Sequence, residues 1–114
     1  GGGNANLQMS GFSLTETEED KSETRIIFKG YFAGWCGACK EFKPIWNNVQ
    51  KHFPKKKVVF KEIDCVKDED VCMAAGVRGY PTLVLQNKNG DDEVYEGRRT
   101  EQDIKEYLNK QLSK

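Results

Sequence analysis

The chain has 114 residues and a mass of 13.0 kDa, which is the size of one domain with a single core. Basic and acidic side chains both number 18, so the net charge is zero and gives no reason to propose nucleic-acid binding. No apolar run approaches the roughly 20 residues that a membrane span needs, so no membrane segment is expected.

The charges are distributed unevenly along the chain. Residues 1–24 carry five acidic side chains and one lysine, whereas residues 25–114 carry 17 basic and 13 acidic ones. Residues 1–24 also contain few large apolar side chains. We therefore expect them to be a flexible, acidic segment or an engineered remnant, followed by one folded domain over residues 25–112.

The folded region should begin with a strand and a helix. Residues 26–32 are mostly β-branched or aromatic and too few for a helix, which predicts a central strand covered on both faces. After Cys36 and Cys39, apolar side chains recur at helical spacing and predict a helix of about four turns. Its apolar positions are Phe42, Ile45, Trp46, Val49 and Phe53.

A second strand and a short helix follow. Residues 58–63 predict the strand, and residues 68–75 predict the helix, which should end at Gly76. Residues 82–86 and 93–95 flank a turn-rich segment and predict a β-hairpin.

The last element should be a helix that begins at Thr100. Thr100 and Asp103 have capping-box spacing, and an apolar stripe follows them at Ile104, Tyr107, Leu108 and Leu112. The complete order predicts an α/β fold: a mixed sheet of four to five strands, with parallel central strands and an antiparallel C-terminal hairpin, flanked by helices.

The two cysteines at the first strand-to-helix junction carry the clearest chemical signal. Unpaired N–H groups and a partial positive charge at a helix start favour a thiolate at Cys36. A pKa of ~7 instead of ~8.5 takes about 2 kcal/mol and raises the thiolate fraction at neutral pH to roughly half. We expect Cys36 to be the nucleophile and Cys39, one turn further on, to be the resolving thiol that releases a substrate from it.

Residues 32–40, with the sequence FAGWCGACK, resemble the active-site segment of the thioredoxin superfamily. The resemblance covers about residues 25–112, and in the second half it is greatest to the catalytic (a-type) domains of protein disulfide isomerases. It implies the thioredoxin fold and a thiol-disulfide oxidoreductase that reduces, isomerises or forms disulfides in proteins. It implies no cofactor. The expected partners are protein substrates with disulfides or thiols and an unidentified reductase or oxidase, and the chain itself is expected to be a monomer.

The resemblance also implies a cis peptide bond before Pro81, facing the two cysteines. The backbone N–H and C=O of Tyr80 could then pair with an extended substrate strand beside the reactive sulfur. The expected substrate-binding residues are Trp35, Gly37, Ala38, Val77, Tyr80 and Pro81, with Gly97 on the same surface.

Three departures from the family pattern qualify these expectations. Ala38 stands where thioredoxins have proline and isomerases have histidine, which predicts an intermediate to reducing potential. Gly30 stands where most members have a buried carboxylate that accepts the proton of the resolving cysteine. The segment before Arg25 is shorter and less apolar than in typical members, which predicts a trimmed first helix.

Glu62 could replace the carboxylate that Gly30 lacks. We expect it to enter the space left by Gly30 as a buried or half-buried acid near Cys39, with a raised pKa, and to accept the proton of that thiol. The alternative is a surface glutamate paired with Lys61 or Lys29, and the sequence favours neither.

Cys65 and Cys72 form a second pair. The resemblance favours a structural disulfide between them, and two buried free thiols, which a reducing cytosol would enforce, are the alternative. A zinc site of all four cysteines is disfavoured, because a six-residue gap does not fit metal-ligand spacing, and no metal is expected.

A second function and two compartments remain open. The chain could be a polypeptide-binding module that uses the surface around Tyr80 and Pro81 with little turnover. The likeness to isomerases implies the endoplasmic reticulum lumen if the chain is an excised domain. The ending at Lys114 without a retention signal favours the cytoplasm if it is complete.

Overall fold

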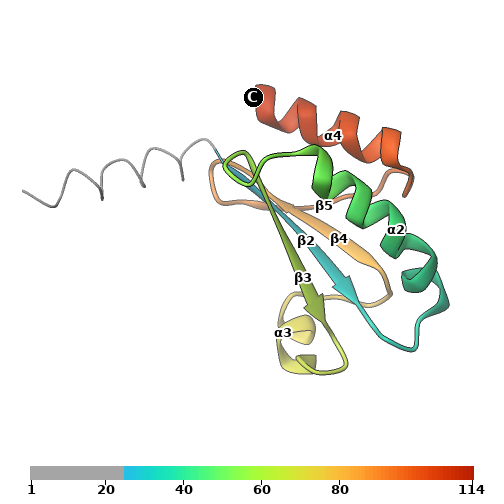
Figure 1. Ribbon diagram of the computed structural model, residues 1–114. Coiled ribbons are helices and arrows are strands. Elements are labelled where there is room, and N and C mark those ends of the chain that lie inside the picture. Colours follow the sequence, from blue (N-terminus) through green and yellow to red (C-terminus); the bar gives the residue numbers. More distant parts are fainter. Residues whose placement is uncertain (1–24) are drawn as a thin grey trace, which may run out of the picture.

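The computed structural model describes residues 25–114 (Figure 1), so the predictions for residues 1–24 lie outside the described part. From Ile26 onward the elements follow the predicted order of strand, helix, strand, helix, hairpin and helix. They are β2 (Ile26–Phe32), α2 (Gly37–His52), β3 (Val58–Asp64), α3 (Glu69–Ala74), β4 (Thr82–Gln86), β5 (Asp92–Val94) and α4 (Glu101–Ser113).

The described strands form one mixed sheet in the order β3-β2-β4-β5. β2 and β3 run parallel, with Ile26 opposite Val58, because α2 returns the chain to the same end of the sheet between them. β4 runs antiparallel to both β2 and β5. A mixed four-stranded sheet with an antiparallel hairpin is therefore confirmed. β5 lies one residue earlier than expected, so Tyr95 follows the strand instead of ending it.

β2 lies inside the sheet and is covered on both faces, as its composition predicts. Ile26 and Phe28 are 0% exposed and belong to the main core with residues of α2 and α4. Tyr31 has the opposite pleat and is 5% exposed, in a smaller core that also contains Cys72 of α3. The two faces of one strand thus connect the large helices with the α3 segment.

Trp46 of α2 is the centre of an aromatic cluster against β2 and β3. Its ring centroid lies 5.7 Å from that of Phe28, 5.4 Å from Phe32 and 5.3 Å from Phe60, and Trp46 is only 1% exposed. Burying one large apolar side chain contributes roughly 1.5–3 kcal/mol, so this cluster fixes α2 firmly on the sheet. The start of α2, where Cys36 lies, is therefore held relative to the end of β2.

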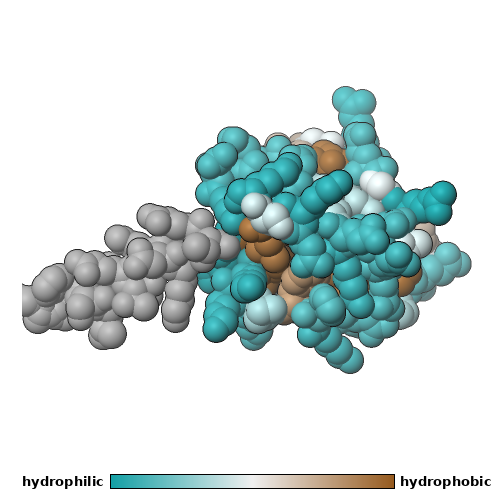
Figure 2. Space-filling model, turned by 90° about the horizontal axis from the view of Figure 1, so that it is seen from above, coloured by the Kyte–Doolittle hydropathy of each residue, from teal (hydrophilic) through white to brown (hydrophobic). Residues whose placement is uncertain are grey.

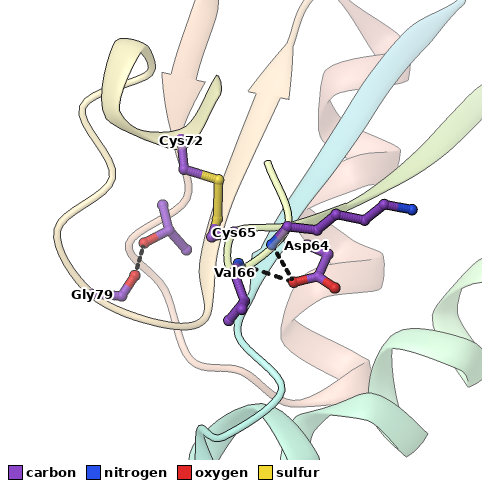
Figure 3. The surroundings of a disulfide bond; sticks show 7 residues. Asp64, Cys65, Val66, Cys72 and Gly79 are labelled. Atoms are coloured by element: carbon purple, nitrogen blue, oxygen red, sulfur yellow. Dashed lines mark hydrogen bonds between the residues drawn. A yellow bond between two sulfur atoms is a disulfide. The ribbon is translucent and has the colours of Figure 1, made fainter. Parts of the chain in front are cut away.

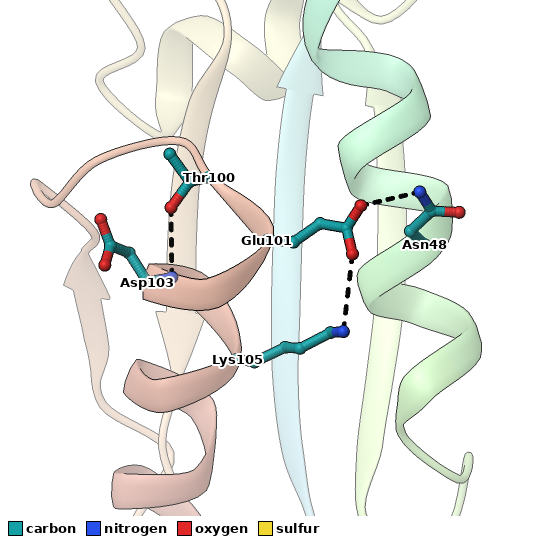
Figure 4. A network of polar contacts seen from close by, with 5 residues as sticks. All are labelled: Asn48, Thr100, Glu101, Asp103 and Lys105. Carbon is teal, nitrogen blue, oxygen red and sulfur yellow. Dashed lines mark hydrogen bonds and ion pairs between the residues drawn. The ribbon is translucent and has the colours of Figure 1, made fainter.

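α2 and α4 lie side by side on one face of the sheet (Figure 1). Asn48 of α2 donates a hydrogen bond of 2.8 Å to Glu101 of α4, and Lys105 lies 3.5 Å from the other carboxylate oxygen (Figure 4). The hydrogen bond from Asn48 is the main reason why the pKa of Glu101 is lowered. Thr100 is the N-cap of α4, as predicted, because its hydroxyl oxygen accepts the N–H of Asp103 at 3.2 Å.

Lys29 does not pair with Glu62, as one sequence interpretation allowed. Parallel pairing places Lys29 opposite Lys61 and Gly30 opposite Glu62, so Lys29 and Glu62 point to opposite faces of the sheet. The ammonium group of Lys29 instead lies 3.5 Å from the carboxylate of Asp92 on β5.

Seen from above, the surface is largely hydrophilic and has small apolar patches (Figure 2).

Four apolar side chains near the C-terminal ends of β2 and β3 are more than half exposed. They are Trp35 after β2 at 71%, Val66 after β3 at 58%, and Val71 and Met73 on α3 at 53% and 71%. Exposed apolar side chains therefore concentrate beyond the C-terminal ends of β2 and β3. Within residues 25–114, no helix has the length and apolarity to span a membrane.

Candidate active site

Cys36 is the N-cap residue of α2. Its backbone is extended, with φ −83° and ψ 118°, and its sulfur accepts the N–H of Cys39 at 3.2 Å. A sulfur atom therefore occupies the place where a serine or aspartate oxygen usually satisfies a free N–H of the first turn. The chain turns into the helix with the thiol directed at the helix start, as the sequence predicted.

These contacts favour the thiolate of Cys36. Hydrogen bonding with the Cys39 side chain lowers the pKa of Cys36 most, and the backbone N–H groups of Cys39 and Ala38 and the charge of Arg99 lower it further. Burial opposes this shift, since Cys36 is only 8% exposed, but the net direction is down. The thiolate of Cys36 is thus favoured relative to that of a free cysteine.

Cys39 has the opposite tendency. Desolvation raises its pKa most, and the hydrogen bond and charge of Cys36 raise it further, because Cys39 is 4% exposed inside the first turn of α2. The N–H of Cys36, which bonds the Ala33 carbonyl oxygen at 3.1 Å, closes the turn that brings the two thiols together. The pair therefore has one sulfur with a lowered pKa and one with a raised pKa.

Tyr80, which precedes Pro81 and is far from Cys36 in sequence, lies against the Cys36 sulfur. The peptide bond between Tyr80 and Pro81 is cis, and the Cys36 thiol donates to the Tyr80 carbonyl oxygen at 3.5 Å. The Trp35 ring meets the Tyr80 ring edge to face at 5.6 Å. Of the predicted substrate-binding residues, Trp35, Gly37 and Ala38 are exposed, Val77 and Tyr80 are half-buried and Pro81 is buried.

Cys65 and Cys72 are joined by a disulfide between the end of β3 and α3 (Figure 3). Their Cα atoms are 5.7 Å apart, and they are 4% and 2% exposed. The bond packs with Tyr31 and Val84 in the smaller core, against which Tyr80 also packs. The Asp64 carboxylate accepts the N–H groups of Val66 and Lys67 at 3.0 and 3.4 Å and so shapes the turn that carries Cys65.

The prediction that Glu62 enters the space at Gly30 as a buried or half-buried acid is wrong. A Cβ atom at Gly30 would lie 2.6 Å from the Phe32 ring and 2.9 Å from the Trp46 ring, so these aromatic rings already fill the space that Glu62 was expected to enter. Glu62 remains on the outer strand of the described sheet, with 47% of its side chain exposed, and forms an ion pair with Lys43 of α2. The partner is neither Lys61 nor Lys29.

Glu62 and Cys39 nevertheless line the same cleft of about 250 Å³. Lys43 lies between them on α2, one turn after Cys39, with its ammonium group 5.3 Å from the centre of the Phe32 ring. The cleft is lined by Phe32, Ala33, Gly34, Cys39, Lys40, Lys43, Glu62, Ile63 and Asp64.

Sequence interpretation missed Arg99 and Lys43. Arg99 follows the hairpin and lines a cleft of about 190 Å³ together with Pro81. Its charge makes a minor contribution to the lowered pKa of Cys36 and slightly opposes the raised pKa of Cys39. Arg99 lies 60 residues after Cys39 in sequence, so no local spacing indicates it. Among residues 25–114, no cluster of three possible metal-binding side chains occurs.

A sequence profile described as Thioredoxin matches residues 14–110. The chain belongs to the thioredoxin family. The profile match begins eleven residues before the start at Arg25 that the sequence predicts for the domain. The resemblance inferred from the CxxC segment is confirmed.

This thioredoxin domain is similar to several protein disulfide isomerases. It is 32% identical to a protein disulfide-isomerase of Aspergillus niger over 82% of this chain and 18% of the relative. It is 34% identical to protein disulfide isomerase-like 2-1 of Oryza sativa subsp. japonica over 89% of this chain and 29% of the relative. The chain thus spans less than a third of these curated relatives.

Solved structures share the fold of this thioredoxin domain. The first two thioredoxin domains of Naumovozyma dairenensis Eps1p match with a TM-score of 0.72 and 21% identity, over 87% of this chain and 39% of theirs. The J-Trx1 fragment of ERdj5 matches with a TM-score of 0.73 and 18% identity, over 88% of this chain and 49% of the fragment. The domain is therefore a thioredoxin fold close in sequence to the catalytic domains of disulfide isomerases.

Proposed function

We propose that this thioredoxin domain is a thiol-disulfide oxidoreductase for protein substrates, with Cys36 as nucleophile and Cys39 as resolving thiol. The observation that carries the proposal is the position of the Cys36 sulfur. It accepts the first-turn N–H of Cys39 at 3.2 Å and lies 3.5 Å from the Tyr80 carbonyl oxygen. This position supports the proposal, because a thiolate there would attack beside backbone groups with which an extended polypeptide could pair.

Reduction of a substrate disulfide would take two displacements. The Cys36 thiolate attacks one substrate sulfur, forms a mixed disulfide and releases the other substrate sulfur as a thiolate that takes up a proton. The Cys39 thiol then loses its proton and attacks Cys36, which releases the second substrate thiol. Two electrons pass to the substrate, and Cys36 and Cys39 become a disulfide. The reverse sequence forms a substrate disulfide.

The substrate chain would lie on the surface made by Trp35, Gly37, Ala38, Val77, Tyr80 and Pro81. Exposed Trp35 offers apolar contact area, and half-buried Tyr80 offers backbone groups next to the sulfur. Such a surface recognises backbone and apolar area, which suits many different protein chains.

Cys39 must lose its proton for the second displacement, and Glu62 is our proposed acceptor, through solvent in the cleft of about 250 Å³ that both residues line. Lys43, ion-paired to Glu62, would hold the carboxylate there. Glu62→Gln should slow release of a mixed disulfide near neutral pH, while Glu69→Gln, which removes an exposed acid of α3, should not. Equal release rates in the two variants would remove Glu62 from the mechanism.

Trapping tests the proposed reaction. Cys39→Ser should accumulate mixed disulfides between Cys36 and substrate and lose turnover, since the releasing thiol is absent. Cys36→Ser should form none. A second candidate function, a polypeptide-binding module, is favoured by the exposed Trp35 and would leave substrate affinity unchanged in both variants without any native turnover.

The working direction depends on the potential of the couple. Ala38 offers neither the histidine of isomerases nor the proline of thioredoxins, so our proposal is an intermediate to reducing potential. Equilibration with glutathione should then give a value nearer to about −270 mV than to about −180 mV. A value at the oxidising end would assign disulfide formation or isomerisation instead. We also propose that a separate reductase or oxidase returns the Cys36–Cys39 couple to its starting redox state.

A further inference from the structure

We propose that Arg99, held in place by Tyr95, selects substrate polypeptides that carry a carboxylate close to their reactive cysteine. The inference deepens the proposed oxidoreductase function, because it names a substrate class for the same site. It starts from the cleft lined by Pro81 and Arg99. The proposed function assigns this cleft no role.

This cleft of about 190 Å³ lies one residue along the chain from the backbone contact of Tyr80 with the Cys36 sulfur. Pro81 lines it and directly follows Tyr80, whose carbonyl oxygen is 3.5 Å from the Cys36 sulfur. An extended chain advances about 3.3 Å per residue, so the cleft should take a side chain within about three residues of the substrate cysteine. Its lining residues are Pro81, Thr82, Leu83, Val94, Tyr95, Glu96, Gly97 and Arg99.

Arg99 supplies the positive charge of the cleft. Its side chain forms no ion pair within residues 25–114, where the three ion pairs involve Lys29, Lys43 and Lys105. Arg98 beside it is also exposed and outside these pairs. Glu96 is the one carboxylate among the lining residues, but it is Arg99 whose charge acts on both thiols. The cleft thus contains a cation that forms no ion pair within residues 25–114 and can meet a substrate carboxylate.

Tyr95 fixes the loop that carries Arg99. Its hydroxyl donates to the Arg98 carbonyl oxygen at 2.5 Å, immediately before Arg99 in the chain. The loop folds so closely over the ring that a Cβ at Gly97 would lie 2.6 Å from the Tyr95 oxygen. Tyr95 is anchored in turn by the Tyr107 ring at 4.8 Å. Because the loop is held, Arg99 would lose less conformational freedom on binding, which makes Tyr95 a positioning residue.

The test compares two disulfide-linked peptides that differ only by aspartate or lysine two residues from the cysteine. Exposed ion pairs contribute about 0.2–1 kcal/mol, so the native chain should reduce the aspartate peptide up to about fivefold faster in kcat/KM. Arg99→Gln should remove this preference, and Tyr95→Phe should weaken it but have no further effect in the Arg99→Gln background. Tyr107→Phe, which removes the hydroxyl that donates to Glu93 at 2.8 Å, is the matched control and should keep the preference.

Alkylation of Cys36 gives a second readout that needs no turnover. The ratio of its rates with anionic iodoacetate and neutral iodoacetamide reports the local charge, because both reagents attack the same thiolate. The ratio should fall in Arg99→Gln and Tyr95→Phe and stay unchanged in Tyr107→Phe. Equal reduction of the two peptides, or an unchanged ratio in Arg99→Gln, would overturn this inference alone. No reduction of either peptide would overturn the proposed function.

Discussion

At Cys36, one sulfur atom combines a structural and a chemical role. It caps α2 by accepting the Cys39 N–H, and the same contact stabilises negative charge on the sulfur. Cys39, three residues later, is more deeply desolvated and has a raised pKa. The two cysteines thus differ in pKa because Cys36 caps the helix start, whereas Cys39 is desolvated inside the first turn.

The pH dependence of alkylation should report this difference. Since the pKa of Cys36 is lowered chiefly by hydrogen bonding with the Cys39 side chain, its alkylation should reach the plateau at a lower pH than that of free cysteine. In Cys39→Ala this contact is absent, so the pKa of Cys36 should rise and the rate profile should move to higher pH. Iodoacetamide rates across pH measure the shift, with Cys36→Ser as the control that lacks fast alkylation. A profile that does not move would contradict the assignment.

At the scale of elements, aromatic packing of α2 on the sheet positions the site. The rings of Phe32 and Trp46 leave no space for a side chain at Gly30, so an acid at this position would require them to move. Gly30 is buried within a strand between two paired neighbours. The absence of a carboxylate at Gly30 and the close packing of the aromatic rings there therefore go together.

Gly30→Ala should destabilise the domain. The added Cβ would lie 2.6 Å from the ring of Phe32, which is 7% exposed and has little room to move. Overpacking of this kind costs about 1–3 kcal/mol, measurable as a lower free energy of unfolding in urea. Gly34→Ala is the matched control, because nothing lies within 4 Å of its Cβ position. Equal unfolding free energies for the two variants would show that the rings can move aside.

The α4 cap is a second test at this scale. Thr100→Ala removes the oxygen that accepts the Asp103 N–H at 3.2 Å, and should lower the free energy of unfolding by about 1 kcal/mol. Thr100→Ser keeps the oxygen and should retain most of the stability. If both variants unfold alike, the cap contributes nothing measurable.

At the scale of the whole molecule, the site lies where two cores on opposite faces of the sheet come together. The main core holds α2 and with it Cys36, whereas the smaller core holds the Cys65–Cys72 disulfide and contacts Tyr80. Tyr80 packs against the main core as well, so the start of α2 and the segment that carries Tyr80 are brought together by both cores. Their contact, at 3.5 Å between the Cys36 sulfur and the Tyr80 oxygen, depends on both.

Removing the Cys65–Cys72 disulfide should therefore lower the free energy of unfolding. Cys65 and Cys72 are seven residues apart, and closing so short a loop contributes about 2.5 kcal/mol on the chain-entropy account. The Cys65→Ala/Cys72→Ala double variant should lose roughly that amount in urea unfolding relative to the oxidised chain. Against the fully reduced native chain the difference should be small. A large loss relative to the reduced chain would assign the stability to packing of the two side chains instead.

The sequence by itself determined the features that depend on neighbours in the chain. Apolar spacing, strand-like composition, turn residues and the Thr100 cap predicted every described helix and strand to within about a residue or two, because all of these are local properties of the chain. The spacing of Cys36 and Cys39 predicted a thiol pair at a helix start for the same reason. The cis bond at Tyr80–Pro81 and the pairing of Cys65 with Cys72 came from the family resemblance, since no local pattern contains them.

Only the tertiary structure decided which distant groups meet. Strand register places Glu62 on the α2 face, where it meets Lys43, and Lys29 on the opposite face, where it meets Asp92. The closed hairpin likewise returns Arg99 to the cleft beside Pro81. A shift of β3 by one residue against β2 would place Glu62 on the same face as Lys29, and register is set by the packing of whole elements, which no short stretch of sequence specifies.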